Sequence, residues 1–265
     1  MNSQETTRIL VALLLGLTAG GANVLGGLFV ARRQWSHRFL KYFIALGAGF
    51  MLATALLEMI PESVKLAGGP RTIHLPGCTY SIVFSPEFIF VLVLAGYFLV
   101  HFFEHTVAPH FHFGEETHHA EVSHAHASYA ALLGLVIHTF FDGVAIASGL
   151  LVSTWLGGVI FTAVFLHKIP EGFTVSSLML ASGQSRAASF ASSAILGAAT
   201  LAGMALMFAL RSTVADALPF SAGVTLYVAA SDLIPEVNRE PHAGMAVLVF
   251  VGVAILLALK AIFKM

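Results

Sequence analysis

Two short segments of the chain place metal-binding residue types at the same spacing. Residues 138–143 read HTFFDG and residues 167–172 read HKIPEG, so each has a histidine, a carboxylate four positions later, and then a glycine. Residues four apart lie on one face of a helix. Two imidazoles and two carboxylates are a natural ligand set for Zn²⁺ or another divalent transition metal. Because Cys78 is the only cysteine, the sequence excludes a thiolate metal cluster and a disulfide framework.

Both segments lie within apolar stretches, which makes their charges costly. A charge at the middle of a membrane costs about 2.5–3.5 kcal/mol or more. Asp142, Lys168 and Glu171 therefore need a bound cation, a wet cavity or one another. One interpretation is a buried ion-pair network, with Lys168 bonded to Glu171 or Asp142 and the histidines bonded to helix carbonyls. The match between the two segments favours a metal site.

The composition indicates that the helices carrying these residues cross a membrane. Of 265 residues, 57% are hydrophobic and 10% charged, whereas about a quarter of a soluble domain is charged. These values exclude an ordinary soluble enzyme and a disordered chain, and a net charge of -1 gives no basic field for nucleic acid. Because a helix needs roughly 20 apolar residues to cross a bilayer, we expect an all-α polytopic membrane protein with one transmembrane domain, 1–265. Its eight predicted spans are 9–30, 40–60, 87–107, 129–150, 156–181, 190–210, 217–234 and 243–263.

Basic residues predict how the chain is oriented. The loop between the first two spans contains Arg32, Arg33, Arg38 and Lys41, and the positive-inside rule makes it cytoplasmic. Both termini then lie outside, and the 107–128 loop lies inside. This loop could collect metal or be a solvated linker. Its candidate metal-binding residues are His110, His112, His118, His119, His124 and His126.

Residues 47–62 (GAGFMLATALLEMIPE) and 221–236 (SAGVTLYVAASDLIPE) align without a gap. In an eight-span chain the two segments cross in opposite directions, so the match predicts an inverted repeat, as in many secondary transporters. The acidic residues of the two repeats then lie on opposite faces. We expect Glu58 and Glu62 at an outer entrance and Asp232 and Glu236 at an inner exit.

The sequence resembles the Zrt/Irt-like (ZIP) family of divalent metal transporters over nearly its whole length. The family patterns are close to H-N-x-x-D-G on the fourth helix and to H-E-I-P-x-E or H-N-I-P-E-G on the fifth, similar to HTFFDG and HKIPEG here. The eight spans, the His-rich loop and the LIPE ending of span seven are also similar. The resemblance implies a primary transport site, with Met51 offering a thioether. The site residues would be His138, Asp142, His167 and Glu171.

The chain departs from the family where binuclear members hold a second metal. Thr139 stands in place of asparagine, Lys168 replaces an acidic or amide residue, and span six has no carboxylate. An ammonium beside the first site would repel a second divalent ion. We therefore expect one metal, with Lys168 standing in for the second.

The predicted function is gradient-driven transport of a divalent cation, with Zn²⁺ as the expected ion, towards the cytoplasm. We expect an integral protein of the plasma or inner membrane, in contact with lipid and without an organic cofactor. It would be a transporter rather than an enzyme, and the sequence leaves a homodimer open. One alternative is an intramembrane zinc hydrolase, because His101, Glu104 and His105 match the H-x-x-E-H pattern. Another is a sensor that binds metal without translocating it.

Overall fold

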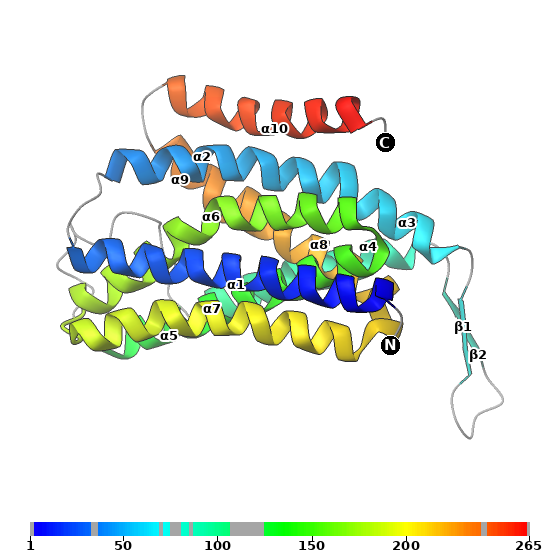
Figure 1. Ribbon diagram of the computed structural model, residues 1–265, viewed down its shortest axis with the longest axis horizontal. Coiled ribbons are helices and arrows are strands. Elements are labelled where there is room, and N and C mark those ends of the chain that lie inside the picture. Colours follow the sequence, from blue (N-terminus) through cyan, green and yellow to red (C-terminus); the bar gives the residue numbers. More distant parts are fainter. Residues whose placement is uncertain are drawn as a thin grey trace.

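The computed structural model describes residues 3–32, 37–68, 71–74, 81–84, 87–106, 125–239 and 243–263. Helices run side by side along the long axis of the molecule, and both ends of the chain lie towards the same end of the bundle (Figure 1). The first half contains α1 (Ser3–Arg32), α2 (His37–Thr54), the π-helix η1 (Ala55–Met59), α3 (Ile60–Ala67), α4 (Phe88–Thr106) and α5 (Ala125–Val152). The second half contains α6 (Thr154–Ala181), α7 (Arg186–Ala209), the 3-10 turn η2 (Arg211–Thr213), α8 (Val214–Tyr227), the π-helix η3 (Val228–Leu233), α9 (Ile234–Asn238) and α10 (Ala243–Phe263).

The length and hydropathy of these helices confirm a polytopic membrane protein. Seven helical segments of the described residues are long and apolar enough to cross a membrane. The remaining predicted span corresponds to α6, which at 28 residues is long enough. Its middle contains His167, Lys168 and Glu171, which lower its hydropathy. The helix that departs most from an apolar span is thus one of the two that hold the candidate metal-binding pairs.

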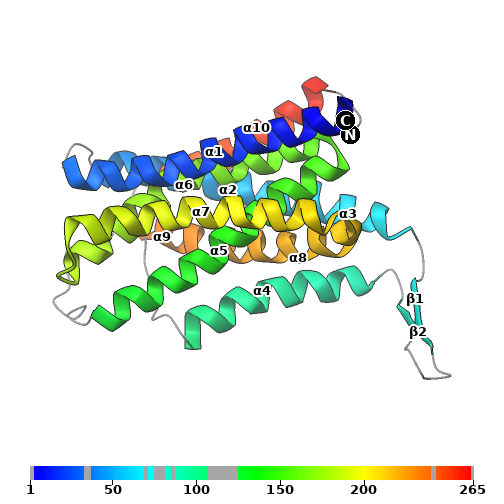
Figure 2. The same cartoon turned by 60° about the horizontal axis from the view of Figure 1, so that its bottom comes forward.

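The exception to the all-helical prediction among the described residues is a small β-hairpin. Strand β1 (Arg71–His74) pairs antiparallel with β2 (Ser81–Phe84), with Arg71 opposite Phe84. The hairpin extends beyond the end of the helical bundle, in the connection between α3 and α4 (Figure 2). We expected only a loop in this segment, because four-residue strands give little periodic signal.

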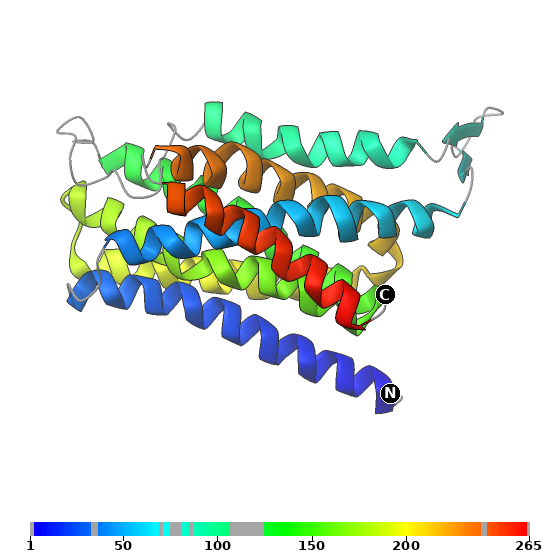
Figure 3. The ribbon, with the colours of Figure 1, turned by 90° about the horizontal axis from the view of Figure 1, so that it is seen from above.

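The helices pack as two groups that meet at α5 and α6. One group contains α1, α5, α6 and α7, which contact one another extensively. In the other group, α2 packs on α10 and α4 packs on α8. Contacts of α2 with α6 and of α8 with α5 join the groups. Figure 3 shows α1 and α4 at opposite edges of the bundle, with α10 crossing over α2.

Glycines bring the helix backbones into contact within each group. On α2, a side chain at Gly49 would collide with the carbonyl oxygen of Val249, and one at Gly252 of α10 would collide with that of Leu46. Small residues allow such close approach in membranes. The pair α8 and α4 repeats this arrangement: Gly223 meets the carbonyl oxygen of Val93, and Gly96 meets that of Phe220.

These contacts extend the inverted repeat beyond the segments that reveal it in the sequence. Gly223 corresponds to Gly49 in the alignment of 221–236 with 47–62, and the two π-helices η1 and η3 fall at matching positions before an Ile-Pro pair. The α2–α3 run and the α8–α9 run point in opposite directions (Figure 1). The same contact recurs within the other group. There, Gly143 and Gly172 lie on the carbonyl oxygens of Thr200 and Asn23, and Gly203 and Gly26 lie on those of Phe140 and Ile169.

Candidate metal centre

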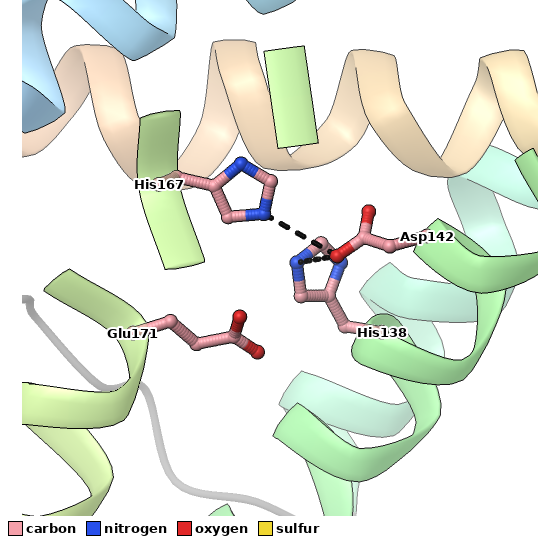
Figure 4. Close-up of side chains that lie close together, drawn as sticks. All are labelled: His138, Asp142, His167 and Glu171. Atoms are coloured by element: carbon pink, nitrogen blue, oxygen red, sulfur yellow. Dashed lines mark hydrogen bonds and ion pairs between the residues drawn. The ribbon is translucent and has the colours of Figure 1, made fainter. Parts of the chain in front are cut away.

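The two HxxxD/E segments face each other at one buried point between the antiparallel helices α5 and α6. One ligand atom from each of four residues lies within 4.8 Å of the other three, and Figure 4 shows the side chains converging. The four are His138, Asp142, His167 and Glu171. Their exposed fractions range from 0% to 4%, so all four side chains are shielded from solvent.

Asp142 lies between the two imidazoles. Its Oδ2 atom is 3.2 Å from His138 Nε2 and 3.3 Å from His167 Nε2, and the two rings have centroids 5.5 Å apart. Both imidazoles therefore aim one nitrogen at the same carboxylate oxygen. The two ring nitrogens and the carboxylate therefore surround one small volume, which is the arrangement that a cation site needs.

Each histidine has a different second contact. His167 Nδ1 lies 3.1 Å from the carbonyl oxygen of Ala163, one turn earlier on α6, to which an Nδ1–H would donate. Such a bond fixes the ring and leaves Nε2 free to bind metal. His138 Nδ1 and Asp142 Oδ1 are buried without a hydrogen-bond partner, and His138 Nε2 makes no hydrogen bond besides its 3.2 Å approach to Asp142 Oδ2. Buried polar atoms normally have partners, so these atoms point to a cation as the missing contact.

The ammonium group of Lys168 lies inside this group of ligands. Its Nζ atom is 2.6 Å from Asp142 Oδ2 and 2.6 Å from Glu171 Oε2, and it also donates to Thr139 Oγ1 at 3.3 Å. The Thr139 hydroxyl donates to Glu171 Oε1. The structure therefore contains the ion-pair network among the same residues that could hold a metal. Lys168 pairs with both carboxylates, whereas the sequence suggested one or the other.

Met51, the predicted thioether donor, is fully buried on α2. It belongs to an apolar cluster with Ala163 of α6 and Phe50, against which Leu166 packs. Met51 therefore lies in the apolar contact between α2 and α6. Its role as a ligand stays a prediction.

The carboxylates predicted for the two mouths lie towards opposite ends of the bundle, and three of the four form ion pairs. At the α3 end, Glu58 pairs with Lys260 of α10 at 2.7 Å and Glu62 pairs with Lys65 at 2.9 Å. At the α9 end, Glu236 lies 3.9 Å from Lys41. It also lies 3.7 Å from Arg239, and Asp232 lies in the π-helix η3, at the position that matches Glu58 in η1.

Sequence reasoning missed the contribution of Lys260 to the α3 end, and it placed Glu104 at the inner end only as part of the HFFEH segment. A signal for them exists: residues 91–96 read VLVLAG and residues 247–252 read VLVFVG, which makes α4 and α10 a further pair of repeats. In that alignment, Glu104 corresponds to Lys260. Both lie eight residues after the glycine that contacts the neighbouring helix.

The HFFEH segment does not form a metal group. His105 Nδ1 lies 2.8 Å from the carbonyl oxygen of His101, the two rings have centroids 3.9 Å apart, and Glu104 accepts a hydrogen bond from Tyr227 at 2.9 Å. Among the described residues, the centre between α5 and α6 is the one group of three or more ligand types that converges. The hydrolase alternative therefore gains no support from the geometry.

The predicted metal-binding loop falls mostly outside the described residues. His110, His112, His118, His119 and His124 lie there, and only the backbone of His126 is described, in the first turn of α5. Whether this loop collects metal stays a prediction.

Comparison with known proteins agrees with this geometry. The profile of the family described as "ZIP Zinc transporter" matches residues 6–131 and 116–260. The chain is 28% identical over 276 residues to zinc transporter ZIP9 of Micropogonias undulatus, covering 89% of this chain and 86% of that protein. It is 26% identical over 251 residues to zinc transporter ZIP9-B of Xenopus laevis, covering 83% and 82%. It is also 32% identical to human zinc transporter ZIP13, over 43% of this chain and 34% of that protein. The chain therefore belongs to the ZIP zinc transporter family.

Proposed function

We propose that this protein carries Zn²⁺ down its gradient towards the cytoplasm, one ion at a time, through the centre between α5 and α6. The observation that supports this proposal is the convergence of two imidazoles and two carboxylates at one point buried among membrane-spanning helices. The relatives that match most of the chain are named zinc transporters. Because His, Asp and Glu donors discriminate only modestly among divalent transition metals, related ions would compete with zinc.

The charges at the centre favour a single divalent ion. Asp142 and Glu171 contribute two negative charges, and Lys168 contributes one positive charge between them. One zinc ion with Lys168 withdrawn from the carboxylates gives a neutral centre. A second zinc ion would leave two uncompensated positive charges in a region where even one is costly. Lys168 thus acts as a tethered cation that the metal displaces and that returns when the metal leaves.

The ends of the bundle suggest the route. Zinc enters past Glu58 and Glu62, binds at the centre, and leaves past Asp232 and Glu236. The basic cluster between α1 and α2 supports a cytoplasmic position for the α9 end. Movement of the group α1, α5, α6 and α7 against the other helices would expose the centre to each side in turn.

Flux into liposomes loaded with a zinc-sensitive dye tests the proposal. Glu171→Ala removes one carboxylate ligand, and we expect zinc uptake to fall to that of empty liposomes. Asp216→Asn is the matched control, because Asp216 is an exposed carboxylate near the start of α8, and uptake should be unchanged. Zinc binding by the unaltered protein without any flux would favour a sensor and contradict the proposal.

A further inference from the structure

A lysine side chain occupies one of the carboxylates at the α3 end of the bundle. Lys260, in the last turn of α10, places its Nζ atom 2.7 Å from Glu58 Oε1. The same nitrogen donates to the carbonyl oxygen of Leu57 at 2.9 Å. Glu58 and Leu57 both belong to the π-helix η1. One ammonium group therefore bridges a carboxylate and a backbone carbonyl of a single helical segment.

The carbonyl oxygen of Leu57 is available to the lysine because a proline follows one turn later. In a regular α-helix the N–H of residue 61 would donate to this oxygen, but Pro61 has no N–H. Carboxylates and backbone carbonyls are the ligand types that bind hard cations such as Ca²⁺. The ammonium group thus lies where the chain offers oxygen ligands to a cation.

The charges at this end balance as long as Lys260 stays in place. Glu62, one turn after Glu58, pairs with Lys65 at 2.9 Å, so two carboxylates meet two ammonium groups. The exposed fraction of the side chain is 10% for Glu58 and 29% for Lys260, so the pair is open to water. Removal of the Lys260 ammonium would leave one net negative charge, with the Glu58 carboxylate beside the Leu57 carbonyl.

The packing of the helices does not require a lysine at this position. In the two matching helices, Gly96 of α4 and Gly252 of α10 make the same backbone contact with their neighbours. Eight residues after that glycine, α10 has Lys260, whereas α4 has Glu104. The helix contact forms with either residue, so the packing framework does not explain the positive charge of Lys260.

We propose that Lys260 is a specificity-determining residue, a tethered cation that keeps hard divalent ions such as Ca²⁺ from binding at the outer mouth. The inference rests on the proposed function, in which zinc enters past Glu58 and Glu62. Oxygen ligands alone suit Ca²⁺ and Mg²⁺, so a hard ion bound there would obstruct the entrance. Zinc does not need tight binding at the mouth, because its imidazole ligands, His138 and His167, lie at the centre.

Calorimetric titration of Ca²⁺ into the purified protein in detergent tests the inference without any flux. We expect Lys260→Met to bind Ca²⁺ at a site that the unaltered protein does not offer, and we expect this binding to be lost when Glu58→Gln is added. Lys260→Arg keeps the positive charge and should behave as the unaltered protein does. Lys260→Gln covers the case in which the methionine variant does not fold. Equal Ca²⁺ binding by the unaltered protein and by the folded methionine or glutamine variant would overturn the proposal.

Lys65→Met is the matched control for charge. It removes one ammonium group from the neighbouring carboxylate, Glu62, but the Lys65 side chain is 73% exposed. We expect no new Ca²⁺ binding, because a largely exposed pair contributes little. If Lys65→Met creates the same Ca²⁺ site as Lys260→Met, then net charge alone governs this end, and the assignment of the role to Lys260 is wrong.

Zinc uptake into liposomes tests the consequence for transport. External Ca²⁺ should inhibit uptake by Lys260→Met at an about fivefold lower concentration than it inhibits the unaltered protein, which is the upper range for loss of a partly exposed ion pair. Equal inhibition of the two proteins would contradict the proposal. No zinc uptake by the unaltered protein would instead contradict the proposed function, and the Ca²⁺ titration would still decide the role of Lys260.

Discussion

The two halves of this chain share a packing framework and differ in their polar residues. Glycine contacts recur at matching positions in α2 with α10 and in α8 with α4, down to the carbonyl oxygens that they meet. The candidate metal centre keeps the pairs His138 with His167 and Asp142 with Glu171. In the same alignment Thr139 corresponds to Lys168. Near the two ends of the bundle, Glu104 of α4 corresponds to Lys260 of α10.

The comparison distinguishes two sets of residues. The glycines, which hold the helices together, match between the halves, whereas some of the charged residues do not. Backbone contacts through glycine tolerate little change, because a side chain at these positions would overlap a carbonyl oxygen. Polar positions differ between the two halves, with Thr139 opposite Lys168 and Glu104 opposite Lys260. Each of the two unmatched positions places a tethered ammonium in one half only, and both ammonium groups pair with carboxylates.

The largest effect should follow from making the centre symmetric with Lys168→Thr. The variant leaves Asp142 and Glu171 close together without the ammonium, and removing one partner of a buried pair costs about 3–5 kcal/mol. We expect a strong loss of thermal stability in metal-free protein, measured in detergent, and recovery when zinc is added. A metal-free variant as stable as the unaltered protein would show that Lys168 does not compensate these carboxylates.

Glycine substitutions test whether the matching helix contacts of the two halves contribute equally to the free energy of unfolding. Gly49→Ala and Gly223→Ala should each destabilise the protein by about 1–3 kcal/mol through overpacking, and by similar amounts. Gly158→Ala is the control, since a side chain there meets open space and alanine favours a helix. Thermal unfolding in detergent measures all three. Unequal losses of stability in the Gly49 and Gly223 variants would show that the two matching contacts are not equivalent.

The smallest effect is expected at the α3 end. Lys260 keeps 29% of its side-chain exposure in its pair with Glu58, and partly exposed pairs contribute less than about 1 kcal/mol. Lys260→Met should therefore lower the free energy of unfolding only slightly, about as much as Lys65→Met does at the neighbouring pair. A clearly larger loss would mean that this contact holds α10 in place.

The sequence was sufficient for the spans and for the four converging side chains, because hydropathy and a four-residue spacing are local signals. It also predicted the inverted repeat where the two segments align residue by residue. The repeat of α4 and α10 was harder to find, since runs of valine and leucine match by chance and only the glycine and the contact that it makes are informative. Lys168 has a long side chain that can reach either carboxylate, so the choice between one pair and two needed coordinates.

X-ray absorption at the zinc edge of the zinc-loaded protein, with the metal content measured on the same sample, tests the central claim most directly. We predict one zinc ion per chain, with nitrogen from two imidazoles and oxygen from carboxylates in its first shell, and loss of the imidazole signal when both His138 and His167 are replaced by alanine. Two bound ions per chain, or one ion whose surroundings are unchanged by those replacements, would contradict the account.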